Sequence, residues 1–149
     1  MNKETSFKII SLLGLAVAVG GLLFLVYRKT IVSTNIIGTS IQVAMFCLMI
    51  WARLTFGVRS FHAAANTTHG SLVTSGPYKF FRHPIYAAII YFIWAGAASY
   101  PGIQVFSAAI IISLALIVRM LIEEKFLFIV YPEYKSYSEK TMRLIPFIF

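Results

Sequence analysis

Four apolar runs, separated by short polar stretches, dominate the chain. They cover residues 9–27, 36–52, 85–100 and 103–122, and the second run continues, with one arginine inside it, to Arg59. A helix needs about 20 apolar residues to cross a bilayer. The third run is short by this measure, but it suffices if its ends lie among the lipid headgroups. The pattern predicts an all-α, polytopic membrane protein with about four transmembrane helices.

The composition agrees with a membrane protein that forms one domain. The chain has 149 residues, of which 59% are hydrophobic and 12% are charged. Soluble domains are about half apolar and about a quarter charged. The length leaves no room for a separate soluble catalytic unit, so we expect residues 1–149 to be a single domain. The net charge of +8 is not gathered in a basic stripe, which argues against a nucleic-acid partner.

The basic residues are unevenly distributed between the two ends of such a bundle. Four spans place both termini and the polar stretch 60–84 at one end. That end carries Lys3, Lys8, Arg59, Lys79, Arg82, Lys125, Lys135, Lys140 and Arg143. The opposite end carries only Arg28 and Lys29. Because basic residues accumulate in cytoplasmic loops, we expect both termini to be cytoplasmic, and the size and charge pattern favour a prokaryotic inner membrane.

The first run also has features of a signal peptide, because Lys3 and Lys8 precede it and small residues lie within it. The run continues to Arg28 and Lys29 without a cleavage site. We therefore interpret it as a retained span.

Side chains suited to chemistry gather where the polar stretch meets the third run. Pro84 fits the first turn of a helix, since it has no N–H to donate and its φ is already helical. His83 then lies at a helix start, where free backbone N–H groups favour an anionic ligand group, and Arg82 lies just outside. Tyr86 shares a helical face with His83, one turn deeper. From spacing alone, a histidine that merely caps the helix is an equally good interpretation.

A second group of ionisable residues follows at the end of the fourth run. Arg119 and Glu123 are four residues apart, which puts them on one helix face, and Glu124 comes next. Ionisable groups at the end of a span are costly unless they face a cavity or a partner. Since the chain has only five acidic residues, two adjacent glutamates favour a functional site over flanking charges. The sequence does not show which glutamate faces inward.

The other notable residues receive structural interpretations. The three histidines have no common metal-ligand spacing, so we expect no metal site and interpret His62 and His69 as loop residues. Cys47, inside the second run, is interpreted as a small buried apolar residue. Aromatic residues around the third run are expected to contact lipid and anchor the interface, namely Phe80, Phe81, Tyr91, Phe92 and Trp94.

Three motifs resemble one family of membrane enzymes. LVTSGPYKFFRHPIY, RMLIEEKFL and YPEYKSYSEKTMRLIP are similar to segments of the isoprenylcysteine carboxyl methyltransferases and their phospholipid methyltransferase relatives. The weaker WARLTFGVRSF also fits, so the family-like part covers about residues 51–146. Ala88 departs from the pattern, because many members have glycine at this position.

The resemblance implies an enzyme that transfers a methyl group from S-adenosylmethionine to a lipophilic acceptor at the cytoplasmic face of the membrane. The C-terminal half would build a cytosol-facing cofactor pocket, and the acceptor would enter from the bilayer. The implied cofactor-binding residues are Tyr78, Arg82, His83, Tyr86, Glu123, Glu124, Arg143 and Pro146. The catalytic candidates are Arg119, which would orient the acceptor, and Glu123.

The acceptor and two other functions stay open at this point. A carboxylate acceptor is already nucleophilic and needs a group such as Arg119 to hold it, whereas a lipid amine needs a base to take its proton. The alternatives are an NADPH-dependent membrane reductase on a related scaffold and a non-enzymatic membrane binding protein. The chain has no Gly-x-Gly-x-x-Gly or Walker motif. The expected partners are membrane lipids and a lipophilic acceptor.

Overall fold

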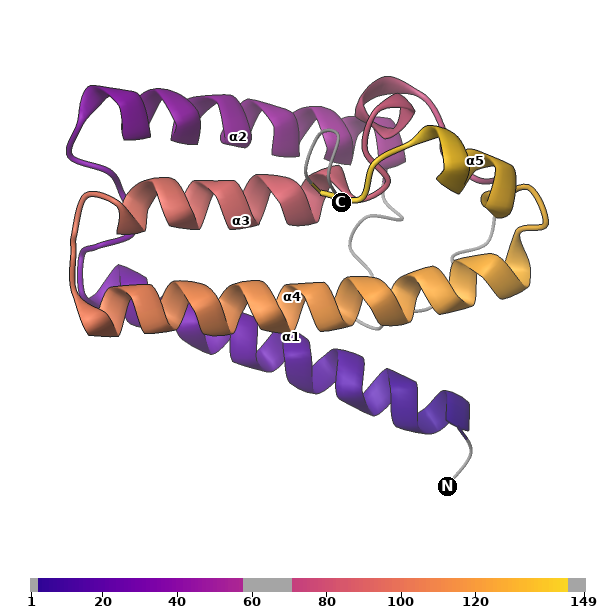
Figure 1. Ribbon diagram of the computed structural model, residues 1–149, viewed down its shortest axis with the longest axis horizontal. Helices are drawn as coiled ribbons and strands as arrows, with labels where there is room; N and C mark the ends of the chain where they lie inside the picture. The colour runs from indigo at the N-terminus through magenta and orange to yellow at the C-terminus, as the bar shows by residue number, and fades with distance from the viewer. Residues whose placement is uncertain (1–2, 58–70, 145–149) are drawn as a thin grey trace.

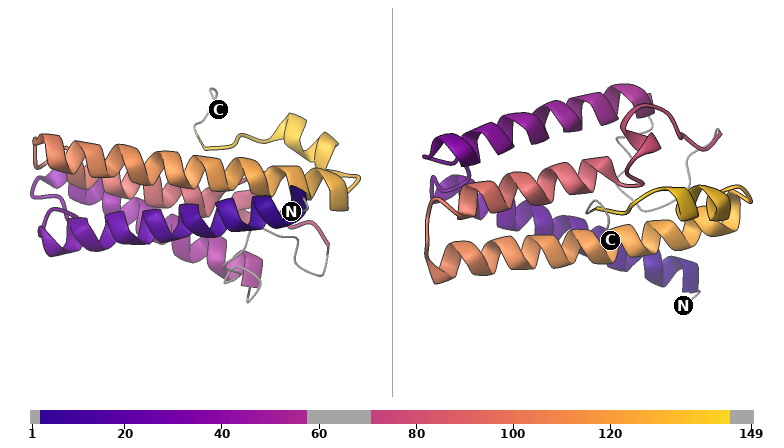
Figure 2. Two further views of the ribbon diagram at one scale, coloured as in Figure 1. Left: turned by 90° about the horizontal axis from the view of Figure 1, so that it is seen from below. Right: turned by 45° about the horizontal axis from the view of Figure 1, so that its top comes forward.

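The computed structural model describes residues 3–57 and 71–144, and its regular elements are helices (Figure 1). Their bounds are α1 Lys3–Tyr27, α2 Ile36–Phe56, η2 Gly76–Lys79, α3 Pro84–Ala97, α4 Ile103–Val130 and α5 Tyr134–Lys140. The four long helices run alternately in opposite directions, so the starts of α1 and α3 and the end of α4 share one end of the bundle (Figure 1). We call it the site end, and η2 and α5 also lie there (Figure 2). Residues with sequence-based expectations that lie outside the described ranges are Arg59, His62, His69 and Pro146.

Within the described residues, three helices are long and apolar enough to cross a membrane, namely α1, α2 and α4. Helix α3 has 14 residues, which corresponds to about 21 Å of helix against a hydrocarbon core of about 30 Å. It nevertheless packs between α2 and α4. The predicted fold class, a polytopic all-α membrane protein, is confirmed, and the third run is its short member as expected.

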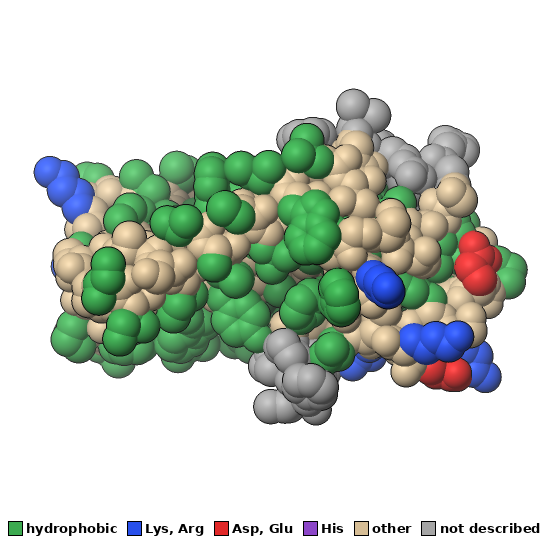
Figure 3. Space-filling view, turned by 90° about the horizontal axis from the view of Figure 1, so that it is seen from above, with side chains coloured by type: hydrophobic (Ala, Val, Ile, Leu, Met, Phe, Trp, Pro, Cys, Tyr) green, Lys and Arg blue, Asp and Glu red, His purple; other side chains and the backbone are tan. Residues whose placement is uncertain are grey.

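The outer surface of the bundle is apolar along most of its length. Leu23, Ile36 and Ile103 are 64%, 80% and 81% exposed, and green apolar side chains cover the face drawn in Figure 3 up to the site end, where charged side chains gather. So much exposed apolar surface indicates a lipid environment. Cys47 is also exposed, so its predicted burial is wrong. Lipid is as apolar as a protein core, and an apolar run therefore does not report which of its faces is inside.

Helix α4 is longer than the fourth apolar run, which ends at residue 122. It continues past residue 122 to Val130 and ends where Tyr131 turns to extended backbone, with φ −114° and ψ 103°. Pro132 follows, and the residue before a proline avoids the helical conformation. Glu123 and Glu124 therefore lie inside a helix, so the backbone fixes the directions of both side chains.

Two of the aromatic residues expected at the lipid surface serve the packing of the helices. Trp94 Nε1 donates a hydrogen bond to Ser113 Oγ at 3.0 Å, which joins α3 to α4. The Tyr91 hydroxyl donates to the carbonyl oxygen of Leu144 at 3.3 Å. Phe80, by contrast, is 52% exposed. The positions of the aromatic residues in the sequence therefore did not distinguish side chains that join helices from side chains that face the lipid.

A polar network closes the end of the bundle opposite the site. Gln42 Oε1 accepts from the Ser33 N–H at 2.9 Å, and Gln42 Nε2 donates to the carbonyl oxygens of Ile31 at 2.7 Å and Phe92 at 3.0 Å. Asn35 caps α2 by accepting from the Gly38 N–H at 2.8 Å. The network fixes the turn between α1 and α2 against α3.

This network requires a glycine at position 96. A Cβ added to Gly96 would collide with the carbonyl oxygen of Ile31 and lie 3.1 Å from Gln42 Nε2. We predict that Gly96→Ala lowers the free energy of unfolding by about 1–3 kcal/mol, the usual cost of overpacking. Gly20→Ala is the control, since nothing lies within 4 Å of its added Cβ, and it should leave stability unchanged or raise it. Thermal denaturation in detergent measures both variants, and equal midpoints would contradict the prediction.

Candidate active site

Pro84 fixes the start of α3 and the place of two basic side chains. It occupies the first turn, and His83 is the N-cap residue, as predicted. The His83 side chain makes no capping hydrogen bond and is 4% exposed. Within the described part of the chain, Arg82 Nε and His83 Nε2 are buried and lack a hydrogen-bond partner. The helix start thus holds two buried nitrogen atoms that make no well-aligned hydrogen bond, and that of His83 lies within ion-pair distance of a carboxylate.

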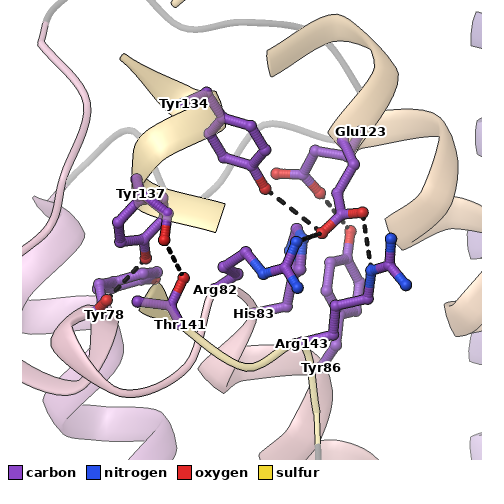
Figure 4. Close-up of polar contacts among 10 residues, drawn as sticks. Tyr78, Arg82, His83, Tyr86, Glu123, Tyr134, Tyr137, Thr141 and Arg143 are labelled. Atoms are coloured by element: carbon purple, nitrogen blue, oxygen red, sulfur yellow. Dashed lines mark hydrogen bonds and ion pairs between the residues drawn. The ribbon is translucent and has the colours of Figure 1, made fainter. Parts of the chain in front are cut away.

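Glu124 lies at the centre of a buried group that we call the Glu124 cluster. Its other members, Arg82, His83, Tyr134 and Arg143, are labelled in Figure 4. The Glu124 carboxylate accepts from Arg82 Nη1 at 3.0 Å and from Arg143 Nε at 2.9 Å. The Tyr134 hydroxyl donates to Glu124 Oε1 at 3.4 Å, and His83 Nε2 lies 3.4 Å from the same oxygen. The Glu124 side chain is 5% exposed, and a carboxylate is stable at that depth only when it is paired and hydrogen-bonded.

The segment after α5 is pinned across the site end by its backbone. The Met142 N–H donates to the carbonyl oxygen of Phe80 at 3.0 Å, and the Met142 carbonyl accepts from the Arg82 N–H at 2.7 Å. Phe81 and Met142 form an isolated parallel bridge. This pairing carries Arg143, the next residue, to the α4 carboxylate.

Two buried tyrosines, Tyr78 and Tyr134, and the half-buried Tyr137 lie near this segment. The Tyr137 hydroxyl donates to the carbonyl oxygen of Tyr78 at 2.7 Å, and burial raises the pKa of Tyr137 to about 12. Burial, followed by the charge of Glu123, raises the pKa of Tyr78. Burial, followed by the charge of Glu124, raises the pKa of Tyr134. All three hydroxyl groups therefore stay protonated near neutral pH, and those of Tyr134 and Tyr137 serve as donors.

Glu123 belongs to a second group, the Glu123 cluster, which faces α1 and α3. The Tyr86 hydroxyl donates to Glu123 Oε2 at 2.9 Å and accepts from Arg119 Nε at 2.9 Å. Arg119 Nη1 donates to the carbonyl oxygen of Ser11 at 3.1 Å and to Ser11 Oγ at 3.0 Å. Glu123 is half-buried and Arg119 is buried. Because successive helical residues point about 100° apart, the two adjacent glutamates serve different clusters.

The two clusters meet at the first turn of α3, where the rings of His83 and Tyr86 lie 5.7 Å apart. The predicted site residues that the structure brings into the clusters are Arg82, His83, Tyr86, Arg119, Glu123, Glu124 and Arg143. Tyr78 borders them through its bond from Tyr137. Pro146 lies outside the described residues.

Sequence reasoning missed two members of the clusters. Ser11 is the only serine or threonine in the first run, and that isolation was the available signal. Tyr134 is the middle of three tyrosines spaced three residues apart, a pattern that places them along one helical face.

Fold and clusters together define a polytopic helical membrane protein with a buried, charged site at one end of its bundle. A family model described as phospholipid methyltransferase matches residues 17–134. The chain belongs to the phospholipid methyltransferase family, as its motifs predicted, and membership implies a membrane enzyme that methylates lipids. The match begins inside α1, earlier than the motif-based range of 51–146, and ends at Tyr134. Neither the curated proteins nor the solved structures contain a significant match to the chain.

The Glu124 cluster predicts a large effect of one neutral substitution. Glu124→Gln keeps the shape of the side chain but leaves Arg82 and Arg143 without the charge that balances them. We expect a loss of about 3 kcal/mol in the free energy of unfolding, as for other broken buried ion pairs. Trypsin should also cleave after Arg143 faster than in the wild type. Glu139→Gln, at an exposed position of α5, is the control, and equal cleavage rates in the two variants would contradict this role of Glu124.

The raised pKa of Tyr137 predicts how docking of α5 depends on pH. Once α5 is undocked, Tyr137 regains an ordinary pKa of about 10, whereas in the docked state its pKa is about 12. The contribution of this hydroxyl to docking is therefore complete below pH of about 10 and is lost as the pH rises through about 12. The difference in tyrosinate absorbance between wild type and Tyr137→Phe should titrate near pH 12. A difference curve centred near pH 10 would show that the hydroxyl is not buried.

Proposed function

We propose that the chain transfers a methyl group from S-adenosylmethionine to the polar head of a lipid acceptor, at the cytoplasmic surface of the membrane. One observation carries the proposal. The basic residues at the start of α3 and the glutamates near the end of α4, which are far apart in the sequence, meet at one end of the bundle. Family membership supports lipid methylation in general.

The Glu124 cluster fits the amino-acid end of the cofactor, which carries a carboxylate. Arg82 Nε and His83 Nε2 are buried nitrogens with no hydrogen-bond partner among the described residues. The free N–H groups in the first turn of α3 add partial positive charge. We assign Arg82 and His83 to this carboxylate and give Glu124 the role of holding Arg82 in place. When bound, S-adenosylmethionine supplies an electrophilic methyl group on a sulfonium.

The Glu123 cluster fits the acceptor. A lipid amine must lose its proton before it can attack the methyl group. Glu123 is half-buried and held by the Tyr86 hydroxyl, so it is the carboxylate placed to take that proton. Methyl transfer otherwise needs alignment of the reacting groups and exclusion of water. Arg119, one helical turn away, is the cation that holds an anionic part of the lipid head.

A carboxylate acceptor of the isoprenylcysteine kind is the second candidate, and Arg119 is the residue that favours it. Such an acceptor needs no base, so Arg119 would be essential and Glu123 would not. For a lipid amine, substitution of Glu123 should therefore cause the largest loss of activity. For a carboxylate acceptor, substitution of Arg119 should cause it.

We place the site end, with both termini, on the cytoplasmic side of the membrane. The described site end exposes Lys79, Lys125, Lys135 and Lys140, whereas the described opposite end exposes Arg28 and Lys29. Basic residues accumulate on the cytoplasmic side of membrane proteins. This orientation gives the site access to a water-soluble cofactor.

The test is incubation of membranes that contain the protein with methyl-labelled S-adenosylmethionine, followed by analysis of the lipid fraction. We expect label that survives mild base, as N-methyl groups do, whereas a methyl ester would lose it. Glu123→Gln should lower the transfer rate at least about a hundredfold, the usual contribution of a general base. Glu133→Gln, at an exposed position before α5, should keep the wild-type rate.

Calorimetry with the purified protein tests the cofactor separately. We expect S-adenosylmethionine to bind to the wild type, and to bind at least tenfold more weakly to Arg82→Ala, since a charged hydrogen bond contributes about 1.5–3 kcal/mol. A folded wild-type protein that does not bind S-adenosylmethionine would refute the proposal, and a preference for NADPH would favour a reductase instead.

A further inference from the structure

Helix α1 contributes a polar contact to the Glu123 cluster in addition to its apolar packing. Most of its contact with α4 is apolar and close, as at Gly21, where an added Cβ would lie 2.5 Å from Ile112. Ser11 makes a polar contact instead. It is fully buried, and both its carbonyl oxygen and its hydroxyl oxygen accept from Arg119 Nη1, at 3.1 Å and 3.0 Å.

These bonds fix the plane of the Arg119 guanidinium. Nη1 is held by Ser11 on α1, and Nε is held by the Tyr86 hydroxyl on α3 at 2.9 Å. A planar group held at two of its nitrogens cannot rotate without breaking one of the contacts. The same Tyr86 hydroxyl donates to Glu123. Ser11, Arg119, Tyr86 and Glu123 thus form one continuous chain of hydrogen bonds across three helices.

Ser11 lies outside every sequence signal of the enzyme family. The family match begins at residue 17, and the motifs begin at residue 51. We propose that Ser11 is a positioning residue that orients Arg119 toward the acceptor, so that α1 is part of the active site as well as a membrane anchor. The inference rests on the proposed function for its catalytic consequence, while the positioning itself is a property of the folded chain.

The kinetic test compares Ser11→Ala with Ser11→Thr. Alanine keeps the backbone carbonyl that accepts from Arg119 and removes the hydroxyl that accepts from it. Threonine keeps a hydroxyl on the β-carbon, as in serine. We expect Ser11→Ala to lower kcat/KM for the lipid acceptor about tenfold, as the loss of one hydrogen bond to a charged group predicts, with the affinity for S-adenosylmethionine unchanged. Ser11→Thr should restore most of the rate. Leu12→Ala, at a 44% exposed position of the same helix, should behave as wild type.

A second measurement does not depend on activity. In protein labelled with ¹⁵N-arginine, the Arg119 guanidinium, assigned with Arg119→Lys, should show slow rotation in the wild type and in Ser11→Thr. It should rotate faster in Ser11→Ala. The rotation rate of the Arg119 guanidinium tests the role of Ser11 separately from the proposed function. If the wild-type protein transferred no methyl group, the proposed function would be refuted, and the rotation rate would still decide the role of Ser11.

Two results would overturn the inference. One is a Ser11→Ala protein with wild-type kinetics and an unchanged Arg119 signal. The other is an equal loss of rate in Ser11→Ala and Ser11→Thr, together with an equal fall in melting temperature, which would make Ser11 a packing residue.

Discussion

The pairing of one buried carboxylate with two arginines organises the site end of the molecule. Glu124 lies on α4, Arg82 precedes α3 and Arg143 follows α5, so three distant parts of the chain meet at one side chain. A carboxylate removed from water needs such partners. The requirement is mutual, because the Arg82 side chain is itself only 11% exposed and is balanced by the Glu124 carboxylate. Removing the Glu124 carboxylate would therefore release both the segment around Arg143 and the segment around Arg82 that leads into α3.

The adjacent glutamates lie in different environments because a helix turns about 100° per residue. Glu124 is enclosed and neutralised, which suits a residue that holds others in place. Glu123 is less buried and accepts a hydrogen bond from a neutral donor, the Tyr86 hydroxyl. A single glutamate at this point of α4 could not supply both environments.

The sequence predicted the helical membrane fold and most residues of the two clusters. Apolar runs separated by turns gave the number and order of the long helices, and Pro84 gave the start of α3 and the place of His83. The resemblance implied that Arg82 and Glu124 line one pocket, but their direct contact was not predicted, because no local pattern reports a contact between distant segments of the chain. The further course of α4 to Val130 was missed, because Glu123 and Glu124 resemble the charged flank of a span while the helix stops only at the proline after Tyr131.

The wrong expectations for Cys47 and Trp94 share one physical cause, the lack of contrast between lipid and protein interior. In a soluble helix the apolar stripe marks the buried face, but in a bilayer both faces are apolar. Cys47 could therefore not be placed by its neighbours, and Trp94 could not be assigned to lipid or to α4. Ser11 is informative for the same reason, since a hydroxyl in an apolar run must find a partner inside the protein.

The short third helix explains how charged groups are accommodated near the membrane. Helix α4 has 28 residues and α3 has 14, so part of α4 near the site end has no helical neighbour in α3. Helix α5 and the residues around Met142 lie over that part of α4, as Figure 2 shows, and η2 packs against the end of α2. Irregular backbone is tolerated at such depth only when protein surrounds it, and here Phe80, Arg82 and Met142 satisfy one another. Pro84 sets where α3 begins. It therefore leaves a region beside α4 that α5 and the residues around Met142 cover, and the charged groups of the site lie in this region.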